Sequence, residues 1–404
     1  MTISAADSPN ATAPRVFLFS CAERFGGAEV YLAGLALELA RRGSDVALVC
    51  GTLLVEPMRH RLGGAAITIL SEDAVVWDWT KDATSNIRRQ AAFLDSFRSR
   101  HDPFISFINL NWLNVAAGLL QALADEPHRA VIHVHLCPHS LNLSEVERII
   151  LSDSVYHATW SVVSADNRRF IARSLGLDPD EAVSRIDVIY NGAANVEGDP
   201  GERNDTARRT ARRRVRLPDE RSIVLSIGRH DTQKGFEEAL TVMQRLQPLL
   251  PALLYVWVGG GTLFDRHRQM VVDTGLEATV WLFAERPDIA DFYRAADLYY
   301  MPTKYEGFAL AMLEAAFYGL PIVMNDISSA REFVPEGLDE CLVPPLRTWQ
   351  HVWRLHDLLS GPVERRVEIG AALQRRGQRF TRSGMYGIMC DRVQKLVVSD
   401  RARH

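Results

Sequence analysis

This sequence has few cysteines, no apolar segment long enough to span a membrane and only a small net charge. It contains five cysteines among 404 residues, widely scattered and without a Cys-x-x-Cys pair. That pattern favours reduced thiols in a cytosolic protein over a disulfide framework or a zinc site. The two longest largely apolar stretches, 112–124 and 308–324, are shorter than a membrane span. A net charge of -4 excludes a strongly basic nucleic-acid binder. We therefore expect a soluble, cytoplasmic protein without a nucleic-acid partner.

The N-terminal residues 1–14 lack the features of a targeting signal. They are small, polar and acidic, with no positively charged segment and no apolar segment after it. A secretory signal needs both, so we predict a disordered lead-in rather than a signal peptide.

The rest of the chain alternates short apolar strands with helical patterns. Strands are predicted in the first half at Val16–Ser20, Val46–Cys50, Ile67–Leu70, Phe104–Ile108, Ala130–His135, His157–Val163 and Ile186–Tyr190. In the second half they are predicted at Ile223–Ile227, Leu253–Val258, Thr279–Phe283, Leu298–Met301 and Ile322–Asn325. Helices are predicted between them, among others at Ala28–Arg42, Asp166–Ser174, Phe236–Gln247, Thr262–Thr274, Ile289–Ala295 and Ala309–Tyr318. This alternation predicts an α/β protein with parallel sheets covered by helices on both faces.

Length and a polar break divide the chain into two Rossmann-like domains. A chain of 404 residues is too long for one typical core. Residues 15–192 would form the first domain, 193–221 a linker without a sustained apolar face, and 222–380 the second domain. The helix at 381–404 is a candidate to pack back on the first domain. Ligands of open parallel sheets bind beyond the carboxyl ends of the strands, so we expect both sheets to face a central cleft that holds the site.

The stretch Tyr305–Val323 is the most informative part of the sequence. It carries two carboxylates, Glu306 and Glu314, separated by an almost wholly apolar run. Gly319 and Pro321 close the run in the manner of a helix end. Glu306 therefore lies in the loop before a short helix, and Glu314 lies inside that helix.

The start of this helix is suited to an anion. Gly307 offers the bend before it, and the first backbone N–H groups, at Phe308, Ala309 and Leu310, have no carbonyl partner within the helix. An open helix N-terminus is a natural phosphate site. With a carboxylate before it and another beyond it, the stretch could bracket a phosphorylated sugar. The alternative is a buried helix with one badly placed glutamate.

Two cations follow the first strand of the second half. Arg229 and Lys234 lie on one strand-to-helix loop. A diphosphate needs more than one counter-charge as it departs, and two cations on one loop suit it. Ordinary surface arginine and lysine are the alternative.

Glycines precede a helix in both halves. Gly26 and Gly27 follow the first strand of the chain, where they permit a close approach of the backbone to a ligand or serve only the turn. The run 259–261 resembles a dinucleotide fingerprint but lacks its third, spaced glycine. We interpret that run as a turn that either lies beside a bound phosphate or serves only packing.

Three histidines lie near the end of one strand in the first half. Alternation puts His133 and His135 on the same side of the strand, and His139 falls in the loop beyond. A metal site would require a further ligand at fixed spacing, which the sequence does not clearly supply. We predict a single cleft-facing imidazole, His135, and no metal.

Arginine is concentrated in the stretch Arg203–Arg216 of the linker. The preferred interpretation is a solvated helix. The functional alternative for such a cationic run is a contact with anionic lipid or nucleic acid.

Taken together, these motifs resemble the GT-B glycosyltransferases of family 4, also called group 1, which are retaining enzymes that use nucleotide sugars. The most specific match is Glu306 to Glu314 with Gly319 and Pro321, which is similar to the family's Glu-x7-Glu signature and the Gly-x-Pro after it. The supporting matches are Gly26-Gly27-Ala28-Glu29, Tyr190-Asn191-Gly192, Gly228-Arg229 with Lys234-Gly235, and Ala295-Ala296-Asp297. The resemblance covers nearly the whole chain, from Val16 to the late helices.

The resemblance implies a donor site in the second domain and an acceptor side in the first. Arg229 and Lys234 would bind the donor diphosphate, and the N–H groups of Phe308, Ala309 and Leu310 its distal phosphate. Glu314 would bond the ribose, and Glu306 would lie at the donor sugar. From the first domain, His135 would line the sugar pocket and Gly27 would approach the leaving phosphate.

The implied reaction moves a hexosyl or N-acetylhexosaminyl group from a nucleoside-diphosphate sugar to a hydroxyl of a small molecule, a polysaccharide or a lipid-linked glycan. It retains the anomeric configuration and requires no metal or other cofactor. A membrane contact through Arg203–Arg216 would accompany a lipid-linked acceptor.

The sequence departs from the family pattern at a few positions. Ser328 and Ser329 stand before Glu332 where the family often has Gly-Gly, and Ala309 replaces a usual glycine. None of these changes removes a residue assigned to chemistry. Two alternatives stay open: a nucleotide-sugar epimerase on the same scaffold, which needs acid and base groups at a ring carbon, and a non-catalytic GT-B scaffold subunit.

Overall fold

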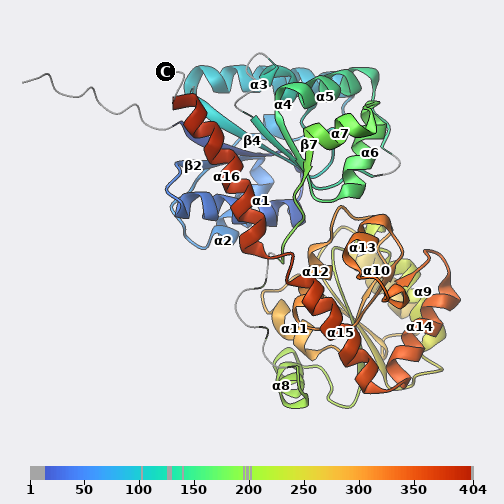
Figure 1. Cartoon of the computed structure of the whole chain (residues 1–404). Coiled ribbons are helices and arrows are strands. Elements are labelled where there is room, and N and C mark those ends of the chain that lie inside the picture. The colour runs from blue at the N-terminus through green and yellow to red at the C-terminus, as the bar shows by residue number, and fades with distance from the viewer. Residues whose placement is uncertain are drawn as a thin grey trace, which may run out of the picture. The chain divides into compact units, whose positions relative to one another are not determined.

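The computed structural model describes residues 14–101, 103–124, 130–138, 141–193, 196, 200 and 203–401. The expected lead-in, apart from Pro14, and His139 lie outside these ranges. The chain forms two compact units (Figure 1). Unit 1 comprises Met1–Val163, Asn167–Ile189 and Tyr386–His404, and unit 2 comprises Ser164–Asp166 and Tyr190–Met385.

Unit 1 is built on a seven-stranded parallel sheet. Its strands, in chain order, are β1 (Arg15–Ser20), β2 (Val46–Cys50), β3 (Thr68–Ser71), β4 (Phe104–Leu110), β5 (Ala130–Val134), β6 (Thr159–Val162) and β7 (Ile186–Val188). In space their order is β3-β2-β1-β4-β5-β6-β7. Its helices are α1 (Gly27–Arg41), α2 (Thr52–Leu62), η1 (Asp73–Val75), α3 (Ala83–His101), α4 (Ala117–Leu123), α5 (Glu145–His157), most of α6 (Ala165–Leu175), α7 (Pro179–Arg185) and most of α16 (Arg382–Arg401).

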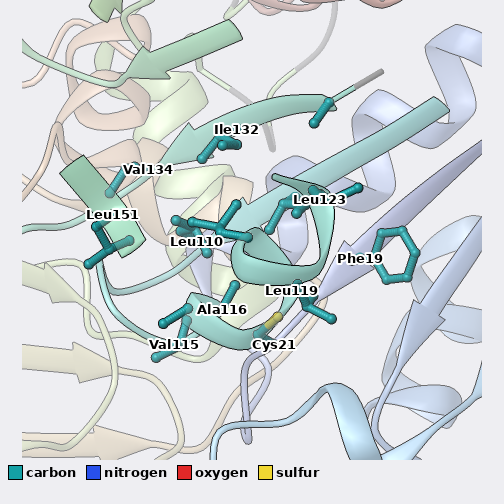
Figure 2. Packing of buried hydrophobic residues seen from close by; sticks show 14 of the residues in the cluster. Phe19, Cys21, Leu110, Val115, Ala116, Leu119, Leu123, Ile132, Val134 and Leu151 are labelled. Carbon is teal, nitrogen blue, oxygen red and sulfur yellow. The ribbon is translucent and has the colours of Figure 1, made fainter. Parts of the chain in front are cut away.

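The core of unit 1 explains why its strands are apolar throughout. All seven residues of β4 and all five of β5 are buried, as expected for strands covered on both faces. Side chains from β4 and β5 pack against α4 and α5, with Leu110, Leu119 and Ile132 in one cluster (Figure 2). The rings of Phe17 and Phe97 meet edge to face at 4.8 Å between centroids. Such aromatic pairs add stability beyond their buried area.

Helix α16 packs on α1 within unit 1 (Figure 1). An ideal Cβ at Gly34 would lie 2.0 Å from the Tyr386 hydroxyl oxygen, so the missing side chain of Gly34 makes room for that ring. Arg42 Nη1 donates to Asp391 Oδ1 at 2.6 Å. The C-terminal residues from Tyr386 onward are therefore part of unit 1.

Unit 2 repeats the same design with six parallel strands. They are β8 (Ser222–Ile227), β9 (Leu253–Val258), β10 (Val280–Phe283), β11 (Leu298–Met301), β12 (Ile322–Asn325) and β13 (Leu342–Val343), in the spatial order β10-β9-β8-β11-β12-β13. The helices are α8 (Asp205–Val215), η3 (Thr232–Lys234), α9 (Phe236–Leu246), α10 (Phe264–Asp273), α11 (Ile289–Ala295), α12 (Leu310–Phe317), α13 (Ser328–Phe333), η4 (Asp339–Cys341), α14 (Thr348–Ser360) and α15 (Val363–Gly377).

The predicted α/β architecture with two parallel sheets is confirmed. Each predicted strand is present within a few residues of its expected bounds. The edge strand β13, which has only two residues, was not predicted because so short a segment carries no periodicity. In both sheets the strand order reverses between the first strand and its neighbour, at β1/β4 and at β8/β11. Ligands of such sheets bind beyond the carboxyl ends of the strands at this switch point.

The prediction of a solvated linker helix at Arg203–Arg216 is wrong for two of its arginines. Helix α8 packs on α11, and the Arg212 residue is only 2% exposed. Arg212 Nη2 and Arg208 Nη1 bond the two carboxylate oxygens of Asp297 at 2.8 and 2.7 Å. Arg212 also donates to the carbonyl of Ala295. A buried arginine must be paired in this way, and the pairing depends on residues too distant in sequence to be read from the arginine run.

Candidate donor site in unit 2

Two loops follow the strands at the switch point of unit 2, and hydrogen bonds join them. The loop after β8 runs from 228 to 235, and the loop after β11 runs from 302 to 309. Lys304 N donates to Gln233 O at 2.8 Å, and Gln233 Nε2 donates to Tyr305 O at 2.8 Å. Gly235 allows the loops to approach, because a Cβ at its left-handed φ of 76° would lie 2.2 Å from Pro302 O.

Lys234 and Glu306 form an ion pair where these loops meet. Lys234 Nζ contacts Glu306 Oε1, which also accepts a hydrogen bond from Thr303 Oγ1 at 3.0 Å. The side chains of Lys234 and Glu306 are 22% and 12% exposed, so both charges are partly shielded from water. The aliphatic stem of Lys234 lies over Gly228, whose missing Cβ would meet it at 3.4 Å. The pair is therefore held in one geometry, with an edge open to solvent.

Arg229 lies on the same loop but is more open. Its side chain is 46% exposed, and Nη2 pairs with Asp231 Oδ2 at 3.1 Å. Asp231 Oδ1 in turn accepts from the backbone N of Lys234 at 3.2 Å, at the start of η3. The structure thus brings both predicted cations onto one short loop, each with a carboxylate neighbour.

The N-terminus of α12 lies directly after Glu306 in the chain. The helix begins at Leu310, and its N-cap residue Ala309 makes no side-chain capping bond. Its first N–H groups have no carbonyl partner within the helix. The segment before the helix is fixed from another part of unit 2, because Asn191 Nδ2 donates to Phe308 O at 2.7 Å. The ring of Tyr190 also packs on that of Phe308, with centroids 4.9 Å apart.

Glu314 lies inside α12 and is 2% exposed. Its Oε2 accepts a hydrogen bond of 2.8 Å from the hydroxyl of Tyr293, on α11. Burial, followed by the charge of Glu314, raises the pKa of Tyr293 well above its ordinary value, so this hydroxyl keeps its proton and can only donate to the carboxylate. The buried carboxylate is thereby oriented by a neutral donor.

The glycine run 259–261 acts as a packing turn. A Cβ at Gly259 would lie 2.1 Å from Gly228 O, and one at Gly261 would lie 2.6 Å from His230 O. His230 is fully buried and its Nδ1 lies 2.8 Å from Nδ1 of His267. Burial, and then His267, lowers the pKa of His230 to about 4. The glycines thus let the β9 loop support the loop that carries Arg229 and Lys234.

The remaining predicted residues, Gly27 and His135, belong to unit 1. Gly27 is the first residue of α1, and Gly26 before it has an extended backbone. His135 follows β5 and is half-buried, with Nε2 2.8 Å from Asn109 Oδ1. Burial lowers the pKa of His135. Gly27 lies beyond the carboxyl end of β1, as the sequence predicted. His135 was predicted as the last residue of its strand and lies directly after β5.

No group of three or more His, Cys, Asp or Glu residues in the described part of the chain has the arrangement of a metal site. In the same residues, no helix is long and apolar enough to cross a membrane. All five cysteines are buried and reduced.

Several residues that shape the donor site escaped the sequence analysis. Thr303, Gln233 and Tyr293 also make contacts with residues 70, 72 and 21 positions away, which no local pattern reveals. Ser329 was noted only as a departure, yet its hydroxyl donates to Glu306 O at 3.0 Å. One signal was available: Thr303 and Gln233 both lie within three residues of an assigned charged residue.

The comparisons with known proteins agree with this geometry. Residues 207–376 match the family model described as glycosyl transferases group 1. The chain carries a group 1 glycosyltransferase domain. Over 382 residues it is 26% identical to a D-inositol 3-phosphate glycosyltransferase of Rhodococcus opacus, covering 88% of this chain and 82% of the relative.

Solved structures agree on the fold of this glycosyltransferase. The Anabaena protein HepE in complex with UDP-glucose superposes with a TM-score of 0.74 at 17% identity, covering 94% of this chain and 99% of HepE. Sucrose-phosphate synthase from Thermosynechococcus elongatus gives a TM-score of 0.74 at 16% identity, covering 96% and 100%. The fold is the GT-B fold, as predicted. The group 1 glycosyltransferase domain and the relatives named glycosyltransferases identify the chain as a transferase enzyme.

Proposed function

We propose that this glycosyltransferase moves a hexosyl or N-acetylhexosaminyl group from a nucleoside-diphosphate sugar to a hydroxyl acceptor, with retention of configuration and without a metal. The observation that carries the proposal is the Lys234–Glu306 pair beside the open N-terminus of α12, at the switch point of unit 2. HepE, a structural neighbour, binds UDP-glucose, which favours a donor of this chemical class.

The charges of the pair suit the two halves of the breaking bond. When the bond between the anomeric carbon and the phosphate breaks, the diphosphate gains negative charge and the sugar becomes cationic. Lys234, with Arg229 on the same loop, would stabilise the diphosphate, and the N–H groups of Phe308, Ala309 and Leu310 would hold its distal phosphate. Glu306 would face the sugar and its developing positive charge.

The ion pair also prepares the site before the donor arrives. Lys234 and Glu306 are held by each other and by Thr303, so little side-chain freedom is lost on binding. Preorganised charges stabilise a transition state better than charges that must reorient. Glu314, oriented by Tyr293, would bond the nucleoside ribose.

The residues of unit 1 would act on the sugar and on the phosphate that leaves it. Gly27 would let the backbone approach the leaving phosphate, and His135 would bond a sugar hydroxyl. In a retaining reaction the acceptor attacks the face that the phosphate leaves, and that phosphate takes the acceptor proton. Because no protein base is needed for this step, the ionisation of His135 is not required for the chemistry.

Two measurements separate this proposal from its rivals. A transferase releases nucleoside diphosphate only when an acceptor is present, whereas an epimerase changes the sugar without releasing the nucleotide. NMR of the product should show the anomeric configuration of the donor, and turnover should persist after extensive treatment with EDTA. Inversion would contradict the retaining mechanism, and loss of activity with EDTA would contradict metal independence. Absence of any nucleotide-sugar binding in a thermal-shift panel would contradict the proposed donor.

A further inference from the structure

His135 is held by a neutral network at the switch point of unit 1. Asn109, near the end of β4, is 1% exposed and lies opposite His133 of β5 in the sheet register. Its amide nitrogen Nδ2 donates to the carbonyl oxygen of Ala28 at 3.1 Å. Its amide oxygen Oδ1 lies 2.8 Å from Nε2 of His135. Ala28 follows Gly27, so one side chain links the start of α1 to the imidazole.

The contact with Ala28 fixes which way the Asn109 amide points. A backbone carbonyl oxygen can only accept, so the NH2 group of Asn109 must face Ala28. Its oxygen then faces His135, and an amide oxygen can also only accept. His135 Nε2 must therefore carry the proton. In a neutral imidazole the other nitrogen, Nδ1, is then a hydrogen-bond acceptor.

The rest of the environment holds the ring and its backbone in place. His135 N donates to Leu110 O at 2.8 Å, and His135 O accepts from Asn167 Nδ2 at 3.0 Å. The ring meets those of Tyr31 and His133 edge to face, with centroids 4.9 and 4.7 Å away.

The two titratable groups that face the ring are themselves neutral. Burial first, and then Tyr386, raises the pKa of Tyr31 well above its ordinary value. Burial first, and then His135, lowers the pKa of His133 well below its own. The imidazole of His135 thus lies among neutral neighbours, and it is itself kept neutral by burial.

We propose that Asn109 is a positioning residue that fixes His135 in the neutral tautomer with the proton on Nε2, so that Nδ1 is an acceptor for a hydroxyl of the donor sugar. The tautomer assignment rests on unit 1 alone, and the role of Nδ1 rests on the proposed function. A ring fixed in this way accepts a hydrogen bond from a hydroxyl group at Nδ1 but cannot donate one there, so it acts in recognition and not as a general acid.

The tautomer can be read in the intact protein without an assay of activity. We would label the chain with 15N-histidine, record long-range 1H–15N correlations at neutral pH, and assign His135 by its loss in His135→Gln. The expected spectrum has a protonated Nε2 and an unprotonated Nδ1. A protonated Nδ1 with an unprotonated Nε2, or two protonated nitrogens, would overturn the proposal.

Asn109→Asp then tests the positioning role. A carboxylate accepts more strongly than an amide and favours the charged imidazole, so it raises the pKa of His135. Below that raised pKa both nitrogens are protonated and Nδ1 cannot accept. We expect kcat/KM of Asn109→Asp to fall as pH decreases through a new ionisation that the wild type lacks, and the 15N signals of His135 to titrate with it. Titration of activity and signals identical to the wild type would contradict the role.

Ser161→Ala is the matched control, because Ser161 Oγ contacts Nδ1 of the neighbouring His133 at 2.9 Å. It removes a buried hydrogen bond one strand away and should leave the His135 signals and the pH profile unchanged. If His135→Ala transfers sugar as fast as the wild type while the tautomer is as expected, the sugar-binding role fails and the tautomer assignment stands. The two claims can therefore fail separately.

Discussion

The six strands of unit 2 follow the same order as the first six of unit 1, yet the side chains at the two switch points differ in kind. In unit 2 the loops after β8 and β11 present an ion pair, Lys234–Glu306, and a half-exposed Arg229. In unit 1 the corresponding edge holds Asn109 and His135, a neutral amide and a neutral imidazole. The carboxylate of Glu29, in the first turn of α1, is 2% exposed there and accepts a hydrogen bond from Ser20 Oγ at 3.1 Å. The difference shows that the fold supplies the position of a site, and that the side chains on its loops decide what it binds.

Under the proposed function, the contrast would suit a ligand with a charged part and a neutral part. Cations and open N–H groups in unit 2 favour the diphosphate, and neutral hydrogen-bonding groups in unit 1 favour hydroxyl groups of a sugar. The predictions below test whether charge in unit 2 and neutrality in unit 1 are each needed.

Removal of the Lys234 charge should have the largest effect on catalysis. Lys234→Ala leaves Glu306 with Thr303 alone and deprives the departing diphosphate of a counter-charge. We expect kcat/KM to fall by about 10² to 10³, the usual loss for one preorganised electrostatic group.

Lys304→Ala is its control, because Lys304 lies in the adjoining loop and pairs with Glu238 at 2.7 Å instead. Steady-state kinetics of both variants would test whether catalysis depends specifically on the charge of Lys234. A similar loss in both, or in neither, would contradict the special role of Lys234.

The buried arginine of unit 2 should affect stability and not donor recognition. Arg212→Met leaves Asp297 with one partner fewer in a buried setting, and we expect a loss of about 3 kcal/mol in unfolding free energy. Arg213→Met, on the exposed side of α8, should change it little. Donor affinity of the folded Arg212→Met protein should equal that of the wild type. A weakened affinity would show that α8 belongs to the site.

Tyr293→Phe should weaken donor binding moderately. The variant removes the hydroxyl that donates to buried Glu314, at a cost of about 1 to 2 kcal/mol in stability. With Glu314 less well oriented, KM for the donor should rise severalfold while kcat changes little. A drop in kcat with unchanged KM would instead assign Glu314 to the chemical step.

Acid should destabilise both units through their buried histidines. Burial lowers the folded-state pKa of His133 in unit 1 and lowers that of His230 in unit 2 to about 4. The unfolded chain then binds more protons as pH decreases from about 6.5, the ordinary histidine value, towards 4, so stability is lost in that window. Calorimetric scans at pH 7 and pH 5 should give a lower Tm at pH 5. Equal Tm values would show that these imidazoles are not buried as neutral groups.

Local sequence patterns were enough to predict most of the fold and the charged residues of the candidate site in unit 2. Strand and helix periodicity predicted both sheets, and the stretch from Glu306 to Glu314 predicted α12 with its open N-terminus. Partners far apart in sequence could not be predicted. Asp297 for Arg212, Tyr293 for Glu314 and Asn109 for His135 meet only after the sheet has formed, because parallel neighbours are separated by whole helices.

Binding of free nucleoside diphosphate and of the intact nucleotide sugar tests most directly whether unit 2 binds the diphosphate and unit 1 binds the sugar. We would titrate both ligands calorimetrically into the wild type, Lys234→Ala and His135→Ala. Lys234→Ala should weaken both ligands by about tenfold or more, which is about 1.4 kcal/mol. His135→Ala should weaken only the nucleotide sugar. Equal weakening of the free diphosphate by both variants, or unchanged binding in Lys234→Ala, would contradict the account.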